Sequence, residues 1–221
     1  MDDTLYDEID YYKSGFMVVA RCVADDFGLE SKLVFQSLWE VFNSGNHKNT
    51  FDVVLEKFGV SFNIEYIQKL VDIFRCHKPD IKLPSGSRTV LEDLRTRYKF
   101  GLITDGWLPA QDLKVKALGL EKLFDCIVYT EMLGREHWKP SPAGFEKLLA
   151  ELCVDTAQCV YVGDNLEKDF LAPNQMGLKT VRVIRERRIH FGKVPSQQAQ
   201  PHYEIDSIAK LPDLLKEIDD V

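Results

Sequence analysis

The chain has 221 residues, of which 45% are apolar and 29% charged, and its formal net charge is -7. This length and composition suit one large domain, or a core with an inserted module. The acidic balance argues against a nucleic-acid partner, because binding to a phosphate backbone requires a clustered positive surface. The longest basic run, Arg185-Glu186-Arg187-Arg188, is short and is expected to be a solvated loop.

Cysteine usage and hydropathy indicate an intracellular protein. The five cysteines are scattered and include no Cys-x-x-Cys pair, so neither a disulfide framework nor a zinc site is expected. No stretch approaches the roughly 18 apolar residues of a membrane span, and the first residues are acidic rather than a basic leader. The sequence therefore predicts a cytoplasmic protein without a membrane segment.

The first part of the chain predicts an all-helical module. From Ile9 to Gly28 the apolar positions recur every three or four residues, which is the period of one helix face. Ser31 is expected to cap a second helix, and Asn63 to open a fourth. Further helices of this kind are expected over residues 31–45, 51–59 and 63–74. Residues 7–80 are therefore expected to be helical throughout.

After Lys78-Pro79 the pattern changes to helices that alternate with short apolar strands. Strands are expected at 100–103, 126–129, 159–162 and 180–183, and helices near 90–94, 109–118, 142–152 and 167–176. Strands that are apolar on both faces and separated by helices are typical of a parallel sheet with right-handed crossovers. This part of the chain predicts an α/β fold with a Rossmann-like parallel sheet.

Chemically reactive side chains follow three of these strands. In such sheets the active site lies beyond the carboxyl ends of the strands, and Thr104, Lys139 and Asp164 follow strands there. Asp169 comes five residues after Asp164, and two converging carboxylates suit Mg²⁺. Each residue alone has a plainer interpretation: Asp164 can cap a helix, Asp169 and Lys139 can be solvated charges, and Thr104 can be a turn residue.

The first residues connect these positions. Met1-Asp2-Asp3-Thr4 resembles the first signature of the haloacid dehalogenase (HAD) superfamily, Asp-x-Asp-x-Thr, without its leading aspartate. The other signatures follow in that family's order, with Thr104 in Leu-Ile-Thr-Asp-Gly, Lys139 in Trp-Lys-Pro and Gly-Asp-x-x-x-x-Asp at 163–169. The resemblance covers essentially the whole chain. It implies a HAD-like α/β core made of residues 1–6 and 81–221, with 7–80 as an inserted helical cap.

The resemblance also implies a mechanism for the hydrolysis of small phosphorylated metabolites. In that family the first aspartate attacks phosphorus and becomes an aspartyl phosphate. Asp2 would protonate the leaving oxygen and then activate water, and its backbone carbonyl would help to bind Mg²⁺. Asp164 and Asp169 would complete the metal site. The phosphoryl group would be held by Thr104, Asp105 and Lys139. The catalytic candidates are accordingly Asp2, Thr104 and Lys139.

The departure from the family is the missing leading aspartate, together with the strand that delivers it. That strand lies in the middle of the family's sheet, so its absence should leave a gap lined by unpaired backbone groups. The chain as given is expected not to form the aspartyl phosphate. One hypothesis is that Met1 is an internal methionine and that the polypeptide starts roughly ten residues upstream, enough for one strand.

Two other hypotheses remain open at this stage. The protein could be a catalytically dead module that binds phosphate without turnover. It could also be a haloacid dehalogenase, which needs no magnesium, although the paired carboxylates Asp164 and Asp169 favour the metal-dependent branch. The sequence specifies neither the substrate nor the oligomeric state.

Overall fold

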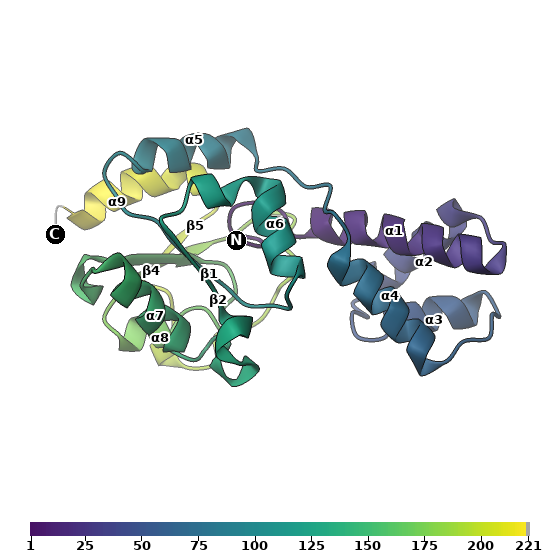
Figure 1. Ribbon diagram of the computed structural model, residues 1–221. Coiled ribbons are helices and arrows are strands. Elements are labelled where there is room, and N and C mark those ends of the chain that lie inside the picture. The colour runs from purple at the N-terminus through teal and green to yellow at the C-terminus, as the bar shows by residue number, and fades with distance from the viewer. Residues whose placement is uncertain (220–221) are drawn as a thin grey trace. The chain divides into compact units, whose positions relative to one another are not determined.

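The computed structural model of the protein describes residues 1–219, and the chain divides into two compact units (Figure 1). The core unit consists of Met1–Ile9 and the chain from Lys82 onward. The helical unit is Asp10–Ile81. The helical unit is therefore an insertion that follows the first residues of the core unit.

Aromatic packing holds the helical unit together. Its helices are α1 (Ile9–Phe27), α2 (Ser31–Asn43), α3 (Thr50–Lys57) and α4 (Ile64–Cys76). Phe16 of α1 packs against the rings of Phe42 and Phe74, with ring centroids 5.6 and 5.5 Å away. Such aromatic pairs each contribute about 0.5–1.5 kcal/mol beyond the burial of their surface. The apolar residues that recur every three or four positions in the sequence thus place aromatic rings of α1, α2 and α4 in contact.

The two predicted capping residues of the helical unit behave differently. Asn63 is the N-cap of α4, and its side chain accepts the backbone N–H of Tyr66 at 2.9 Å. The prediction for Ser31 is wrong, because Ser31 is the first helical residue of α2 and Glu30 takes the N-cap position without a side-chain bond. A capping side chain must precede the first helical residue, so Ser31 lies one position too late.

Among residues 1–219, five parallel strands form the framework of the core unit. They are β1 (Gly101–Thr104), β2 (Cys126–Tyr129), β3 (Val160–Gly163), β4 (Lys179–Val183) and β5 (Tyr203–Ile205). β1 pairs with β2 in one sheet, and β4 lies between β3 and β5 in another. The strands therefore form two parallel sheets, in agreement with the α/β fold that the sequence predicts.

Helices cover both faces of these sheets. They are α5 (Ser85–Leu94), α6 (Ala110–Leu118), α7 (Ala143–Leu152), α8 (Leu171–Gln175) and α9 (Leu211–Asp219). On one face, α5 and α9 lie side by side and pack on β4 and β5 around Val181 and Val183, which are both 0% exposed (Figure 1). On the other face, Phe145 of α7 and Ala172 of α8 pack against Ile103 and other buried residues. Full burial of a valine side chain contributes about 1.5–3 kcal/mol.

One predicted helix is shorter than expected. The sequence suggests a helix over 167–176, but α8 begins only at Leu171. The preceding residues form a turn, in which the carboxylate of Asp169 accepts the backbone N–H groups of Asp164 and Asn165 at 3.1 and 2.9 Å. This turn keeps Asp169 close to the end of β3.

Two smaller expectations can be compared with the structure. No helix within residues 1–219 has the length and apolar character needed to cross a membrane. The five cysteines are free thiols: Cys22, Cys76, Cys126, Cys153 and Cys159.

Candidate active site

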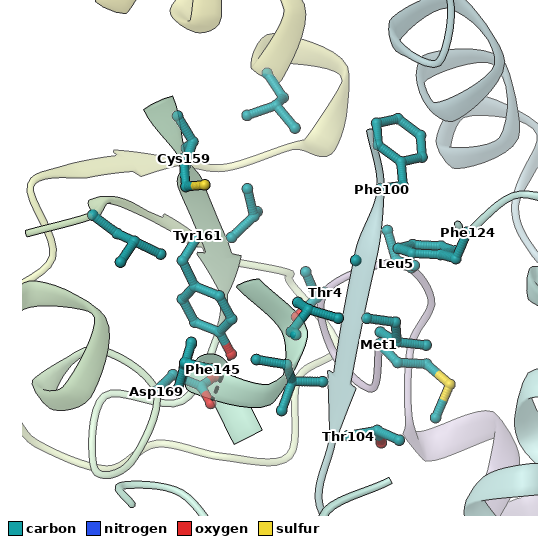
Figure 2. A pocket seen from close by; sticks show the side chains of 18 of the residues that line it. Met1, Thr4, Leu5, Phe100, Thr104, Phe124, Phe145, Cys159, Tyr161 and Asp169 are labelled. Atoms are coloured by element: carbon teal, nitrogen blue, oxygen red, sulfur yellow. Dashed lines mark hydrogen bonds between the residues drawn. The ribbon is translucent and has the colours of Figure 1, made fainter. Parts of the chain in front are cut away.

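A pocket of about 550 Å³ opens in the core unit between β1 and β3. Figure 2 shows Phe100 and Thr104 along one wall and Cys159 and Tyr161 along the other, with both strands running in the same direction. The facing edges of β1 and β3 have no strand partner within residues 1–219, since β1 pairs only with β2 and β3 only with β4. The pocket therefore combines an apolar slot between two strand edges with the polar ends of those strands.

The predicted site residues all line this one pocket, although they come from separate segments of the chain. They are Asp2, Thr104, Asp105, Lys139, Asp164 and Asp169. Thr104 is the last residue of β1, and Asp164 directly follows β3. Parallel strands bring their carboxyl ends to the same edge, which is why residues so distant in sequence meet here.

Lys139 and Asp169 form a buried ion pair at the strand ends. The ammonium of Lys139 lies 2.7 Å from Oδ1 of Asp169, and the two side chains are only 9% and 3% exposed. Oδ2 of Asp169 accepts the backbone N–H groups of Asp164 and Asn165 at 3.1 and 2.9 Å. Burial opposes ionisation of Asp169, but Lys139 outweighs it and holds the pKa of this carboxyl well below its ordinary value. Neither residue is a solvated surface charge.

Asp164 lacks the close cation that Asp169 has. Its Oδ1 accepts the hydroxyl of Thr4 at 3.0 Å. Burial, followed by the neighbouring charge of Asp169, raises the pKa of Asp164 to about 7. A divalent cation would stabilise the charged form of this half-buried carboxylate, and magnesium prefers oxygen ligands.

The donor set for such a cation is small. Within residues 1–219 there is no cluster of three or more His, Cys, Asp or Glu side chains suited to a metal ion. The Asp2 carboxylate does not join Asp164, since its Oδ1 accepts the hydroxyl of Tyr6 at 2.6 Å and the ammonium of Lys114 at 2.9 Å. The residues therefore fit magnesium held by one or two carboxylates, a backbone carbonyl and water, a mode this ion often adopts.

Lys114 is a site residue that the sequence did not reveal. It lies on α6, is 2% exposed, and pairs with both Asp2 and Glu8, at 2.9 and 3.0 Å. A lysine in a short helix is usually solvated, and only its contacts with the first residues of the chain distinguish it. The pair of carboxylates keeps this buried cation compensated.

Asp105 organises the loop that carries Lys139. Its Oδ1 accepts the hydroxyl of Thr130 at 2.8 Å and the backbone N–H of Lys139 at 3.3 Å. Its buried Oδ2 has no hydrogen-bond partner among the described residues, and the ammonium of Lys168 lies 3.5 Å away. Asp105 is thus surrounded by donors that hold it in place.

The basic run at 185–188 anchors the first residues of the chain. Arg185 and Arg187 both pair with Asp7, and the Arg185 side chain is 18% exposed. The backbone N–H of Ile189 donates to Oδ2 of Asp3 at 2.8 Å. The prediction of a solvated loop is therefore wrong for Arg185. The complementary charges of the acidic first residues were the signal that could have suggested this contact.

A parallel α/β core that gathers carboxylates, a threonine and a lysine at its strand ends defines the class of hydrolases to which the sequence signatures point. The chain belongs to the haloacid dehalogenase-like hydrolase family, whose profile matches residues 1–183. The match spans the helical unit as well as most of the core unit.

Several relatives of the chain are phosphatases. It is 29% identical to glyceraldehyde 3-phosphate phosphatase of Methanopyrus kandleri over 231 aligned positions, which cover 99% of this chain and 95% of that protein. It is 34% identical to mouse N-acylneuraminate-9-phosphatase over 133 positions, 60% of this chain and 51% of that protein. In fold it resembles the HAD-hydrolase YfnB of Bacillus subtilis bound to magnesium, with a TM-score of 0.67, 20% identity, and 97% and 95% of the two chains covered.

Proposed function

We propose that this protein is a magnesium-dependent phosphatase that acts on small phosphomonoesters. The observation that carries the proposal is the arrangement at the ends of β1 and β3, where the Lys139–Asp169 ion pair lies beside the poorly compensated carboxylate of Asp164. The ammonium of Lys139 suits phosphoryl oxygens, and the carboxylate of Asp164 suits a cation. The phosphatase relatives and the magnesium-bound fold neighbour support the same assignment.

The residues that hold the phosphoryl group act by position and charge, which supply most of the catalysis in phosphoryl transfer. The buried hydroxyl of Thr104 and the ammonium of Lys139 would donate to phosphoryl oxygens. Asp105 is assigned a different role from the one that the family resemblance implied. Its carboxylate would repel a phosphate, so it positions Lys139 through the backbone N–H and Thr130 contacts.

Bound magnesium would supply positive charge against the phosphoryl oxygens. The carboxylate of Asp164 and the backbone carbonyl of Asp2 are proposed to hold the ion. Asp169 would support the site from behind, since it already accepts the backbone N–H of Asp164 at 3.1 Å.

Asp2 is proposed as the general acid and base. Tyr6 and Lys114 both bond to its Oδ1, which fixes the orientation of the carboxyl group. Oδ2 would give a proton to the leaving oxygen and later take one from water. Lys114 and Tyr6 are positioning residues in this scheme.

The nucleophile is proposed to be an aspartate bonded to the amino side of Met1, at the end of a strand that would fill the slot between β1 and β3. The slot has parallel walls, unpaired strand edges and apolar side chains, and Met1 and Thr4 line it (Figure 2). A residue bonded to Met1 would therefore enter close to Lys139 and Asp164. A strand of about five or six residues has the usual length for such a position.

The test compares phosphate release from a panel of phosphomonoesters by two polypeptides, the chain as given and the chain extended by an apolar strand ending in aspartate. We expect magnesium-dependent hydrolysis by the extended chain alone. Undiminished turnover in excess chelator would contradict the metal assignment. Equal rates for both polypeptides would contradict the aspartyl-phosphate mechanism. Phosphate binding without turnover in the extended chain would favour the catalytically dead alternative.

A further inference from the structure

His190 lines the pocket but belongs to none of the sequence signatures. It lies in the loop that follows β4 and borders the same cavity as Asp2 and Asp164. Its side chain is 45% exposed, and Nε2 lies 3.5 Å from Oε2 of Glu8. The proposed hydrolysis assigns this imidazole no task.

The backbone around His190 is held firmly by its neighbours. The N–H of Ile189 donates to Asp3 at 2.8 Å, and the guanidinium of Arg187 donates to Asp7 at 3.1 Å. A guanidinium nitrogen of Arg188 also donates to the carbonyl of Arg185 at 2.9 Å. The residues on the N-terminal side of His190 therefore fix the position of its backbone, and its side chain lines the pocket.

The charges around His190 favour its protonated form. Although burial opposes ionisation of Glu8, Lys114 and His190 hold the pKa of Glu8 at about 2, so Glu8 is an anion at neutral pH. Contact with Glu8 raises the pKa of His190 above its ordinary value, against the effect of burial. Other charged groups near the ring are Asp164, which raises this pKa, Lys168, which lowers it, and the carboxylate of Asp3.

We propose that His190 is a specificity-determining residue that binds a carboxylate on the leaving group of the substrate. The inference rests on the proposed phosphatase function and names its substrate class, phosphorylated carboxylic acids. Lys139 is buried in its pair with Asp169 and is placed for the phosphoryl group, whereas His190 and Lys168 are 45% and 37% exposed in the same pocket. Partly exposed cations near the phosphoryl site suit a second anionic group.

The test measures binding to the full chain in the presence of magnesium, by calorimetry, with two probes that share a phosphate and a three-carbon skeleton. One probe, 3-phosphoglycerate, carries a carboxylate where the other, glycerol 3-phosphate, carries a hydroxymethyl group. At pH 6 we expect the wild type to prefer 3-phosphoglycerate by roughly tenfold, about the value of one partly exposed charged contact. His190→Gln should abolish the preference and leave affinity for glycerol 3-phosphate unchanged, which a general disturbance of the pocket would not do.

The matched control is His137→Gln. His137 pairs with Glu136 at 3.7 Å with a side chain 43% exposed, much like the pair of His190 and Glu8, but it does not line the pocket. This variant should keep the wild-type preference. An independent readout is the pKa of the His190 ring from proton NMR, which should rise when 3-phosphoglycerate binds and stay nearly constant with glycerol 3-phosphate.

Two results would overturn the inference while leaving the phosphatase proposal intact. One is equal affinity of the wild type for both probes, and the other is an unchanged preference in His190→Gln. If neither probe binds the wild type, both the phosphate site and the role of His190 are wrong. Hydrolysis is not needed for any of these measurements.

Discussion

Charges of opposite sign alternate through the site. Asp2 contacts Lys114, Lys114 contacts Glu8, and Glu8 contacts His190. A buried charge destabilises the fold unless an opposite charge compensates it. Removal of one member of such a pair therefore lowers the free energy of unfolding, because its partner is left uncompensated. Two residue-scale predictions follow from such pairs.

The metal and phosphate roles can be separated by two substitutions in the extended, active chain. Asp164→Asn keeps an oxygen for the Thr4 hydroxyl but removes the ligand charge, so magnesium affinity and rate should fall together. Lys139→Ala should lower the rate while sparing magnesium affinity. It should also destabilise the fold by about 3–5 kcal/mol, because Asp169 is left buried and unpaired. The measurements are magnesium titration, phosphate release and urea unfolding. Identical titration curves for wild type and Asp164→Asn would count against the assignment.

The stability contributed by Glu8 should depend on pH. Its folded pKa of about 2 lies below the ordinary value of 4.5, so the folded state favours the charged form. The contribution is therefore present above pH 4.5 and is lost as the pH falls toward 2. Glu8→Gln should cost at most about 3 kcal/mol at pH 7 and progressively less below pH 4.5. Urea unfolding of both proteins from pH 7 to pH 3 measures this difference. A difference that stays constant with pH would show that the pairing with Lys114 does not stabilise the fold.

At the scale of elements, the spacing of apolar residues predicted most of the helices and four of the strands. The elements it missed or misplaced are β5, α9 and the start of α8. β5 is only three residues long and includes the charged Glu204, so it shows little strand pattern. α9 was not predicted, although its apolar residues Leu211, Leu214, Leu215 and Ile218 recur every three or four positions and pack on the core. The residues just before α8 form a turn closed by the Asp169 carboxylate, a contact that hydrophobic spacing does not reveal.

The helical unit offers a matched pair of capping residues. Asn63→Ala removes the acceptor for the Tyr66 N–H and should lower the free energy of unfolding by about 1 kcal/mol. Asn49 occupies the N-cap position of α3 but makes no side-chain capping bond, so Asn49→Ala should change stability by less than about 0.5 kcal/mol. Urea unfolding of the two variants provides the comparison. Equal losses in both would mean that the capping bond of Asn63 contributes nothing measurable.

At the scale of the whole molecule, the sequence predicted which residues meet in the pocket but not how they are supported. The signature residues could be placed because parallel strands end at a common edge. Lys114 and Arg185 could not, since their partners lie far away in the sequence, at Glu8 and Asp7. Sequence patterns encode local geometry, whereas these contacts are created only by the tertiary fold.

Filling the slot between β1 and β3 should stabilise the protein as well as supply the nucleophile. A strand with apolar side chains would bury them there at about 1.5–3 kcal/mol each and pair both free edges. The extended chain should therefore melt well above the chain as given. Changing the added aspartate to asparagine should retain this stability and abolish hydrolysis. Thermal melting and phosphate release on the three proteins test both effects, and a lower melting temperature for the extended chain would contradict a strand in the slot.

The contacts that assemble the site also constrain the order in which the molecule can form during synthesis. Thr4 bonds Asp164 across 160 positions, and Asp3 bonds Ile189 across 186. The helical unit, by contrast, draws its packing from residues 10–81 and can close while the remainder is still on the ribosome. The first residues of the core unit must then wait, already made and tethered to a folded insertion, until nearly the whole polypeptide has emerged. Because these contacts close such long loops, the active site cannot form until residue 189 has been made.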